Sequence, residues 1–274
     1  MPESQTHEAV HVQETFVKLN GGNIRILSSG SEKESTLVYL HGVGDLGTWL
    51  PVLDEFGKDY RVIRPDHAGF NGSDDFPNVT DVVDLAYLHL DLLDVLGVQN
   101  FVLMGCSFGG WVASQMAILA PTRVTRLLLI DPAGISIEGL SPNLFHLSPT
   151  QSAEMTFSGA AKRAAAVARA QAMPQDETAL RRYHRNRIAT ALVTPNSLMN
   201  DPKLRQRLHR IKSATLIVWG VDDQILPRQH AEYWSEAFPS AQIAMIDGAG
   251  HLPHVEKPIE FASLAHAFLD ESSK

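Results

Sequence analysis

Short apolar runs alternate with segments of helical spacing over most of the chain. Thr36–Leu40, Phe101–Met104 and Val124–Ile130 are runs of mostly apolar residues, as expected for strands that are buried on both faces of a parallel sheet. Thr80–Leu96 and Phe108–Ala120 place apolar residues three and four positions apart, which is typical of amphipathic helices. The alternation predicts an α/β fold, with a doubly wound, mostly parallel sheet that carries helices on both faces.

The two ends of the chain extend this pattern. His11–Leu19 and Ile24–Ser28 are separated by Asn and Gly residues, so they are predicted to form a hairpin. Leu46–Phe56 has helical spacing. Near the end of the chain, Thr215–Trp219 and Gln242–Ile246 are again strand-like, and a predicted helix follows each of them.

The alternation stops between these two parts of the predicted sheet. Over residues 135–210 the apolar strand runs disappear, while Ala153–Met173 and Asp176–Leu192 have helical character and Ser141–Pro149 is loop-like. We therefore predict three regions: the first part of a core domain over residues 1–134, a helical cap insertion over 135–210, and the second part of the core over 211–274.

A GxSxG motif lies where a predicted strand meets a predicted helix. Its residues are Gly105, Ser107 and Gly109, in the strand–turn–helix context that a nucleophile elbow requires. Such a turn lifts the serine hydroxyl above the sheet edge. Ser107 is therefore the predicted nucleophile, and the Phe108 N–H at the helix start is a predicted oxyanion donor. Cys106 is expected to be structural, because the turn aims residue 107.

A second glycine-rich turn, His41-Gly42-Val43-Gly44, directly follows the predicted strand Thr36–Leu40. Glycine lets the backbone approach a reacting carbonyl, so we predict Gly42 beside the substrate and the Val43 N–H as the second oxyanion donor. His41 is expected to order this loop, because the base that acts with a nucleophile elbow lies late in the chain.

Two late loops supply candidates for an acid and a base, in the chain order Ser, Asp or Glu, His. His251 follows the predicted strand Gln242–Ile246 and is the predicted base. Asp223 begins an Asp-x-x-x-Pro turn after the strand before it and is the predicted acid, with the neighbouring Asp222 as the alternative. No metal is expected at His251 and His254, because a lone His-x-x-His lacks a carboxylate or thiol partner.

These loops, in this order, resemble the α/β-hydrolase superfamily, and the resemblance covers almost the whole chain. Residues 64–74, RPDHAGFNGSD, are similar to a strand-end loop of that superfamily, and residues 250–258, GHLPHVEKP, match its terminal histidine segment. The superfamily also inserts a helical cap after its sixth strand, where residues 135–210 fall. The resemblance implies a serine hydrolase that forms an acyl-enzyme, and no cofactor is expected.

Within that superfamily the chain is most similar to esterases and to meta-cleavage product hydrolases, which split carbon–carbon bonds in dienone acids. The latter usually carry Asn before the serine and Trp after the final histidine, where this chain has Cys106 and Leu252. A carboxylic ester is therefore favoured, with Leu252 near the substrate. Arg182 matches a carboxylate-binding arginine of the carbon–carbon hydrolases, or it lies on the solvated face of a basic helix. The expected apolar walls of the cap are Phe145, Leu147, Met155 and Phe157.

Composition limits the classes of molecule that the chain is expected to bind. The formal net charge of −8 disfavours binding to phosphate backbones, so no nucleic acid is expected. The single cysteine excludes an intrachain disulfide, the first residues lack a signal-peptide pattern, and no apolar run approaches the ~20 residues needed to cross a bilayer. We expect a cytoplasmic protein with a small-molecule substrate and no membrane partner, either monomer or homodimer. A cofactor-free lyase or oxygenase and a ligand receptor with a slow triad are the alternatives.

Overall fold

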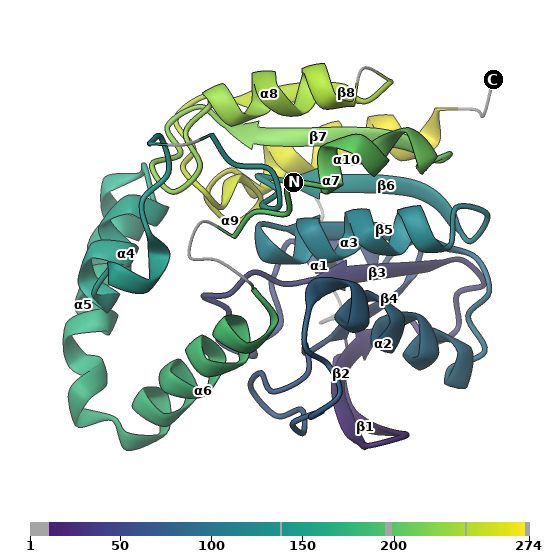
Figure 1. The fold of residues 1–274 in the computed structure, drawn as a ribbon, viewed down its shortest axis with the longest axis horizontal. Coiled ribbons are helices and arrows are strands. Elements are labelled where there is room, and N and C mark those ends of the chain that lie inside the picture. Colours follow the sequence, from purple (N-terminus) through teal and green to yellow (C-terminus); the bar gives the residue numbers. More distant parts are fainter. Residues whose placement is uncertain (1–10, 138, 195–198, 239, 272–274) are drawn as a thin grey trace, which may run out of the picture.

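The computed structural model describes residues 11–137, 139–194, 199–238 and 240–271. Its strands form one sheet in the order β1-β2-β4-β3-β5-β6-β7-β8 (Figure 1). Strands β3 to β8 run parallel to one another, and β2 runs antiparallel to both of its neighbours, β1 and β4. This confirms the predicted mostly parallel sheet. The strands are β1 Gln13–Leu19, β2 Gly22–Ser29, β3 Thr36–Leu40, β4 Arg61–Pro65, β5 Phe101–Cys106, β6 Val124–Ile130, β7 Ala214–Gly220 and β8 Gln242–Ile246.

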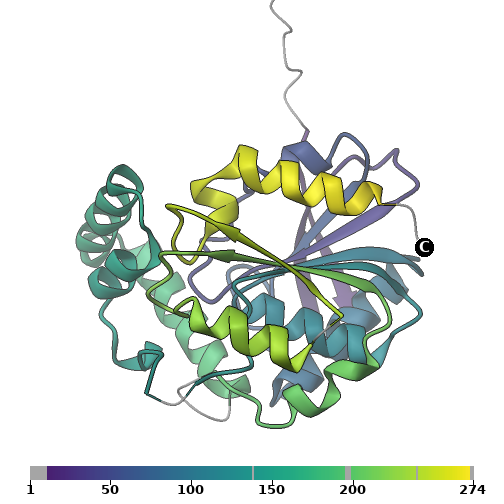
Figure 2. The same cartoon turned by 90° about the horizontal axis from the view of Figure 1, so that it is seen from above.

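Helices cover both faces of the sheet, with α2, α3 and α8 below it and α10 above it in the view of Figure 2. None of the helices in the described ranges has the length and apolar character that crossing a bilayer requires. The helices are α1 Leu53–Phe56, α2 Val82–Val95, α3 Phe108–Leu119, α4 Pro149–Thr156, α5 Ala160–Ala172, α6 Glu177–Val193, α7 Leu204–Arg207, α8 Gln229–Ala237, α9 Pro253–Glu256 and α10 Pro258–Asp270, with short 3₁₀ turns η1 Leu144–His146, η2 Met173–Gln175 and η3 Leu208–Arg210.

The two faces of the sheet bury separate apolar cores. Because successive side chains of a strand point to opposite faces, Val38 and Leu40 of β3 enter one core while Leu37 and Tyr39 enter the other. The first core joins the sheet to α2, α3 and α8, and the second joins it to α1 and α10. Burial on both faces explains why the central strands are continuous apolar runs in the sequence.

The segment between β6 and β7 contains α4, α5, α6 and α7, and its described residues form no strand. In Figure 1, α4, α5 and α6 lie together beyond the end of the sheet at which the parallel strands finish. The helical character predicted for residues 135–210 agrees with this arrangement. The division of the chain into a core and a separate cap at these boundaries stays a prediction.

Two helix predictions were wrong in extent. Only Leu53–Phe56 of the predicted helix Leu46–Phe56 is helical, because Gly47 has φ +71° and Pro51 disfavours helical backbone just before it. The predicted helix Ala153–Met173 is two helices, α4 and α5, with a break at residues 157–159. Ser141–Pro149, predicted as a loop, includes the turn η1 and the first residue of α4.

Candidate active site

Ser107 occupies a strained turn between β5 and α3. Its φ of +55° and ψ of −119° are unusual for a residue with a side chain. A Cβ added to Gly105 would lie 2.4 Å from the carbonyl oxygen of Gly109, and one added to Gly109 would lie 2.2 Å from that of Leu40. Both flanking glycines are therefore required by the packing of the turn, as the motif predicts.

The three residues predicted as nucleophile, base and acid meet in one chain of hydrogen bonds. His251 Nε2 lies 2.8 Å from Ser107 Oγ, and His251 Nδ1 lies 2.7 Å from Asp223 Oδ2. All three side chains are buried. An ionised carboxylate only accepts hydrogen bonds, so Nδ1 carries the ring proton and leaves Nε2 to accept the proton of the serine hydroxyl.

Of the two neighbouring aspartates, it is Asp223 that contacts His251. Asp223 Oδ1 accepts from the backbone N–H groups of Ile225, at 2.7 Å, and Leu226, at 2.9 Å, which fix the carboxylate in its turn. Asp222 is exposed, and its Oδ2 accepts from the Ser158 hydroxyl at 2.7 Å. The geometry favours Asp223 as the acid and leaves Asp222 to anchor the break between α4 and α5.

Glu256, which the sequence did not single out, ties the His251 loop to the same break. Its carboxylate accepts from the N–H groups of Ser158 at 3.2 Å, Gly159 at 2.7 Å and Gly250 at 2.5 Å. The His251 N–H donates to the Thr156 carbonyl at 2.8 Å. Since Ser158 and Gly159 lie almost 100 residues from Glu256 in the sequence, no local pattern could have revealed this role.

The predicted oxyanion loop lies against the serine. A Cβ added to Gly42 would be 3.2 Å from Ser107 Cβ and 3.8 Å from its Oγ. No hydrogen bond within the described residues uses the Val43 N–H. Phe108 is the first residue of α3, where a backbone N–H has no carbonyl partner within the helix. Neither predicted donor amide thus has a hydrogen-bond partner within the described part of the chain.

Replacing Gly42 with alanine is expected to lower kcat about tenfold or more, because the new methyl group crowds Ser107 and displaces the loop from the reacting carbonyl. Gly44→Ala in the same loop is the matched control, since a Cβ there meets no atom within 4 Å. Steady-state kinetics and melting temperatures of both variants measure the effect. Equal activity of the two variants would show that the loop does not serve the reaction.

Three buried histidines, His41, His67 and His89, are hydrogen-bonded to one another and to the loop that follows β3. The His67 N–H donates to His41 Nε2 at 3.1 Å, so His41 carries its proton on Nδ1 and donates to the Gly42 carbonyl at 2.8 Å. His67 Nε2 in turn donates to the His41 carbonyl at 2.9 Å, which leaves its Nδ1 to accept from His89 Nε2 at 2.7 Å. These hydrogen bonds need neutral rings at His41 and His67, and burial favours the neutral ring of His89. The arrangement agrees with the loop-ordering role that was expected of His41.

Two buried histidines, His89 of this cluster and His254, predict a loss of stability in acid. Burial lowers the pKa of His89 to about 3 and, likewise, that of His254 to about 3. The unfolded chain binds these protons below about pH 6.5 and the folded chain does not, so the free energy of unfolding falls as the pH drops from 6.5 toward 3. Each histidine contributes about 1.4 kcal/mol per pH unit in that window.

Urea denaturation at pH 7 and pH 5 measures this loss, which is roughly 2 kcal/mol for each of the two histidines. His89→Gln keeps an N–H donor toward His67 and cannot be protonated, so its stability should depend less on pH than that of the wild type. Equal stability of the wild type at the two pH values would contradict neutral side chains at His89 and His254.

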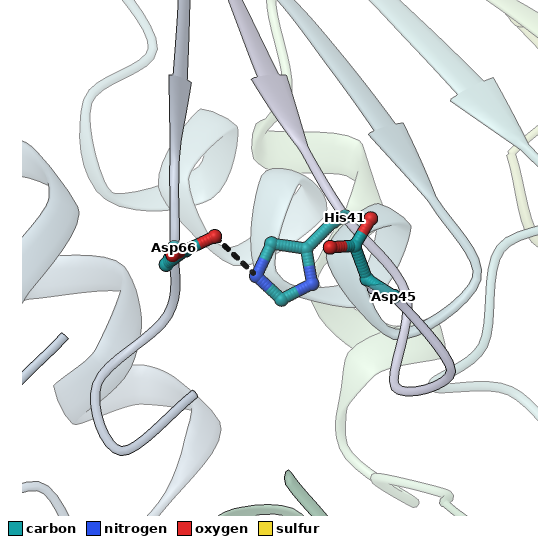
Figure 3. Close-up of side chains that lie close together, drawn as sticks. All are labelled: His41, Asp45 and Asp66. Carbon is teal, nitrogen blue, oxygen red and sulfur yellow. Dashed lines mark ion pairs between the residues drawn. The ribbon is translucent and has the colours of Figure 1, made fainter. Parts of the chain in front are cut away.

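A charged cluster lies beside these histidines. Donor atoms of His41, Asp45 and Asp66 lie within 4.8 Å of one another, which is the composition of a metal site (Figure 3). Arg64, however, donates to both carboxylates, and Arg25 also donates to Asp66. His41 Nε2 already accepts the His67 N–H. The charges and lone pairs of the cluster are thus satisfied by the protein itself, and the cluster braces the loop.

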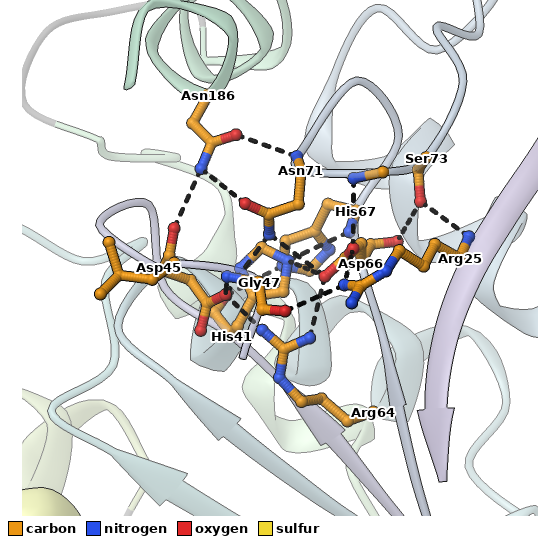
Figure 4. Close-up of polar contacts among 12 residues, drawn as sticks. Arg25, His41, Asp45, Gly47, Arg64, Asp66, His67, Asn71, Ser73 and Asn186 are labelled. Atoms are coloured by element: carbon orange, nitrogen blue, oxygen red, sulfur yellow. Dashed lines mark hydrogen bonds and ion pairs between the residues drawn. The ribbon is translucent and has the colours of Figure 1, made fainter. Parts of the chain in front are cut away.

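The same network reaches helix α6 of the segment between β6 and β7 (Figure 4). Asn186, which is buried, donates to the Asp45 carbonyl at 3.0 Å and to Asn71 Oδ1 at 3.2 Å, and accepts from the Asn71 N–H at 3.0 Å. Asn71 Nδ2 donates to Asp66 at 3.1 Å. Helix α6 is therefore fixed to the loop that follows β3, although nothing in the sequence singles out Asn186.

Arg182 and Leu252, which are predicted to bind substrate, contact other parts of the chain. Arg182 Nη1 donates to the Leu46 carbonyl at 2.8 Å, so its side chain contacts the loop after β3 instead of pointing only into solvent. Leu252, directly after His251, is half-buried against the core on the α10 face. Their roles toward a substrate stay predictions. So do those of the expected wall residues Phe145, Leu147, Met155 and Phe157, which are half-buried.

A groove of about 740 Å³ lies between α6 and the loop after β4. Its lining includes Ala68, Phe76, Leu180 and Ile188, and none of the residues predicted for the site. We therefore do not assign it to the substrate.

Two residues weighed from the sequence, Cys106 and His254, are structural. Burial raises the pKa of the Cys106 thiol well above its ordinary value, and buried His254 is hydrogen-bonded to the Tyr39 hydroxyl at 3.0 Å.

Two relatives of known name cover most of this chain. A dihydrolipoyllysine-residue acetyltransferase component of an acetoin cleaving system from Cupriavidus necator is 29% identical over 91% of this chain and 67% of its own length. A 2-hydroxymuconate semialdehyde hydrolase from Pseudomonas sp. strain CF600 is 29% identical over 86% of this chain and 87% of its own length.

The fold and the sequence also match a solved structure and a protein family. The crystal structure of a membrane phospholipase A, a bacterial virulence factor, superposes with a TM-score of 0.73 at 26% identity, over 94% of this chain and 86% of that one. Residues 37–264, from β3 into α10, match the family described as the alpha/beta hydrolase family. Because that match spans most of the 274 residues, this chain belongs to the alpha/beta hydrolase family.

Proposed function

We propose that this enzyme is a serine hydrolase that cleaves a small, moderately apolar carboxylic ester through an acyl-enzyme. The observation that carries the proposal is the continuous chain from Asp223 through His251 to the hydroxyl of Ser107. Ser107 lies in a strained turn beside the loop of Gly42 and Val43, and among the described residues the Val43 amide has no hydrogen-bond partner. A nucleophile, a base held in one tautomer and amides for an oxyanion are the parts that acyl transfer requires.

In the proposed reaction, His251 Nε2 takes the hydroxyl proton while Ser107 Oγ attacks the ester carbonyl carbon. The Val43 and Phe108 amides donate to the oxyanion of the tetrahedral intermediate. The carbon–oxygen bond of the ester breaks, the alcohol leaves with the proton from His251, and the acyl group stays on Ser107. Water then attacks the acyl-enzyme and gives its proton to His251; as the acyl–Ser107 bond breaks, His251 returns that proton to Ser107 Oγ and the acid leaves.

A second candidate, hydrolysis of a carbon–carbon bond in a dienone acid, is favoured by one relative. The 2-hydroxymuconate semialdehyde hydrolase is 29% identical to this chain. Such a substrate carries a carboxylate, for which Arg182 is the candidate partner. Cys106 and Leu252, in place of the expected Asn and Trp, favour the ester. The scaffold alone does not decide between the two substrates.

A panel of p-nitrophenyl esters with short and long acyl chains, together with a dienone acid, tests the proposal. We expect ester turnover and, for an ester whose acyl-enzyme forms faster than it is hydrolysed, a pre-steady-state burst of p-nitrophenol equal to the enzyme concentration. Faster turnover of the dienone acid, with its loss in Arg182→Ala while ester turnover persists, would support the second candidate. Binding without turnover of any panel member would contradict a hydrolase and support a receptor.

A further inference from the structure

A second carboxylate lies next to Asp223. Asp131 directly follows β6, at the edge of the sheet that carries Ser107, and it is completely buried. Its N–H donates to the Val218 carbonyl at 3.0 Å, and its Oδ1 accepts from the Gly220 N–H at 3.0 Å. Its φ of +41° lies in the left-handed region, which Asp and Asn adopt more readily than other residues with a side chain. Asp131 is thus fixed in place between β6 and β7.

The Asp131 side chain lies close to the proposed acid and base, Asp223 and His251. Carboxylate oxygens of Asp131 and Asp223 and a ring nitrogen of His251 lie within 4.8 Å of one another. Asp131 Oδ2 is buried and accepts no hydrogen bond within the described residues. Asp223, by contrast, accepts from His251 and from two backbone N–H groups. A buried carboxylate oxygen without a donor is costly unless it carries a proton.

The charges around Asp131 also favour a protonated carboxyl group. The titratable groups that face it are Asp223, His251, Glu256 and Cys106, none of which is an arginine or lysine. Burial, and then the charge of Asp223, raise the pKa of Asp131 well above its ordinary value, against the opposing hydrogen bond from Gly220. Two ionised carboxylates at this separation in a buried site repel each other strongly, so one of them keeps its proton.

We propose that Asp131 and Asp223 share one proton, with Asp131 as the hydrogen-bond donor, and that Asp131 thereby positions the Asp223 carboxylate against His251. Asp131 is a positioning residue, because it acts on the reaction only through Asp223. The inference rests on the proposed function in so far as Asp223 is the acid of that reaction. The proposal predicts that a neutral hydrogen-bond donor at position 131 is enough to position Asp223, and that an ionised group there is not needed.

Two substitutions separate these possibilities. Asp131→Asn keeps an oxygen for the Gly220 N–H and supplies an N–H donor to Asp223, so kcat/KM and its acidic pH limb should stay near the wild-type values. Asp131→Ala removes the donor, so kcat/KM should fall about tenfold and the acidic limb should move to higher pH, because a less stabilised Asp223 holds the His251 proton more strongly. A downward move of that limb by about one pH unit or more in Asp131→Asn would overturn the proposal, since it would reveal a lost charge.

Infrared spectroscopy tests the shared proton without reference to turnover. The difference spectrum between the wild type and Asp131→Asn at neutral pH should contain the carbonyl band of a protonated carboxylic acid, shifted in D₂O. Asp247→Asn, an exposed aspartate after β8, should remove carboxylate bands only. Absence of the acid band would overturn the proposal even if Asp131→Ala does not fold. Because the band does not depend on catalysis, its presence in a protein without esterase activity would separate failure of the proposed function from failure of this inference.

Discussion

Ser107→Ala is expected to lower kcat for the best ester by at least ~10³-fold, with the melting temperature close to that of the wild type. The substitution removes the atom that forms the acyl-enzyme and leaves the turn intact, because alanine differs from serine only by the hydroxyl. The strained backbone at φ +55° is held by Gly105 and Gly109, which do not change. Some rate above that in water should remain, since the amides that hold the oxyanion are still present.

Ser235→Ala is the matched control for this prediction, because Ser235 is an exposed serine on α8, away from the three predicted residues. It should turn over esters at the wild-type rate. Titration of active sites with a burst substrate should give one site per chain in the wild type and in the control, and none in Ser107→Ala. Near-full turnover by Ser107→Ala would exclude Ser107 as the nucleophile.

Asp223→Asn is expected to reduce kcat by about 10⁴-fold, the loss seen when the acid of a serine–histidine pair becomes an amide. The hydrogen bond to His251 Nδ1, now 2.7 Å, requires an acceptor. An amide N–H placed there would favour the proton on Nε2, and the ring could then no longer accept the proton of Ser107. The effect is therefore on kcat at every pH, and substrate affinity should change little.

The neighbouring residue supplies the control. Asp222→Asn removes an equal charge one position away, from an exposed residue that contacts Ser158 and not His251. Its kcat should stay near the wild-type value, with at most a small change in stability from the weakened contact to the break between α4 and α5. A larger loss in Asp222→Asn than in Asp223→Asn would reverse the assignment of the acid.

Much of the fold could be predicted from the sequence, because its signals are local. The apolar runs at β3, β5 and β6 are strands buried on both faces, so their composition alone identifies them. Ser107 and His251 were recognisable because strand–turn–helix context and chain order constrain where a nucleophile and a base can lie. The helix predicted over Leu46–Phe56 failed where Gly47 and Pro51 outweighed the apolar spacing.

The parts that could not be predicted depend on contacts between distant segments. The break after α4 exists because core groups, the His251 N–H and the Glu256 carboxylate, bind backbone atoms that a continuous helix would use itself. In the sequence, Asn186 does not differ from the other polar residues of a basic helix. Only the structure reveals its three hydrogen bonds to the loops of the core. Asp131 did carry a signal, as a carboxylate at the end of a parallel strand, but its proximity to Asp223 depends on the pairing of β6 with β7.

Covalent labelling tests the central claim, that Ser107 is the activated nucleophile, most directly. The folded protein is incubated with a fluorophosphonate and digested, and the modified peptide is identified by mass spectrometry. The hydrogen bond between His251 and Ser107 predicts one phosphonyl group per chain, located on Ser107, and no labelling of Ser107→Ala. Unmodified protein after prolonged incubation, or a label on another residue, would contradict the account.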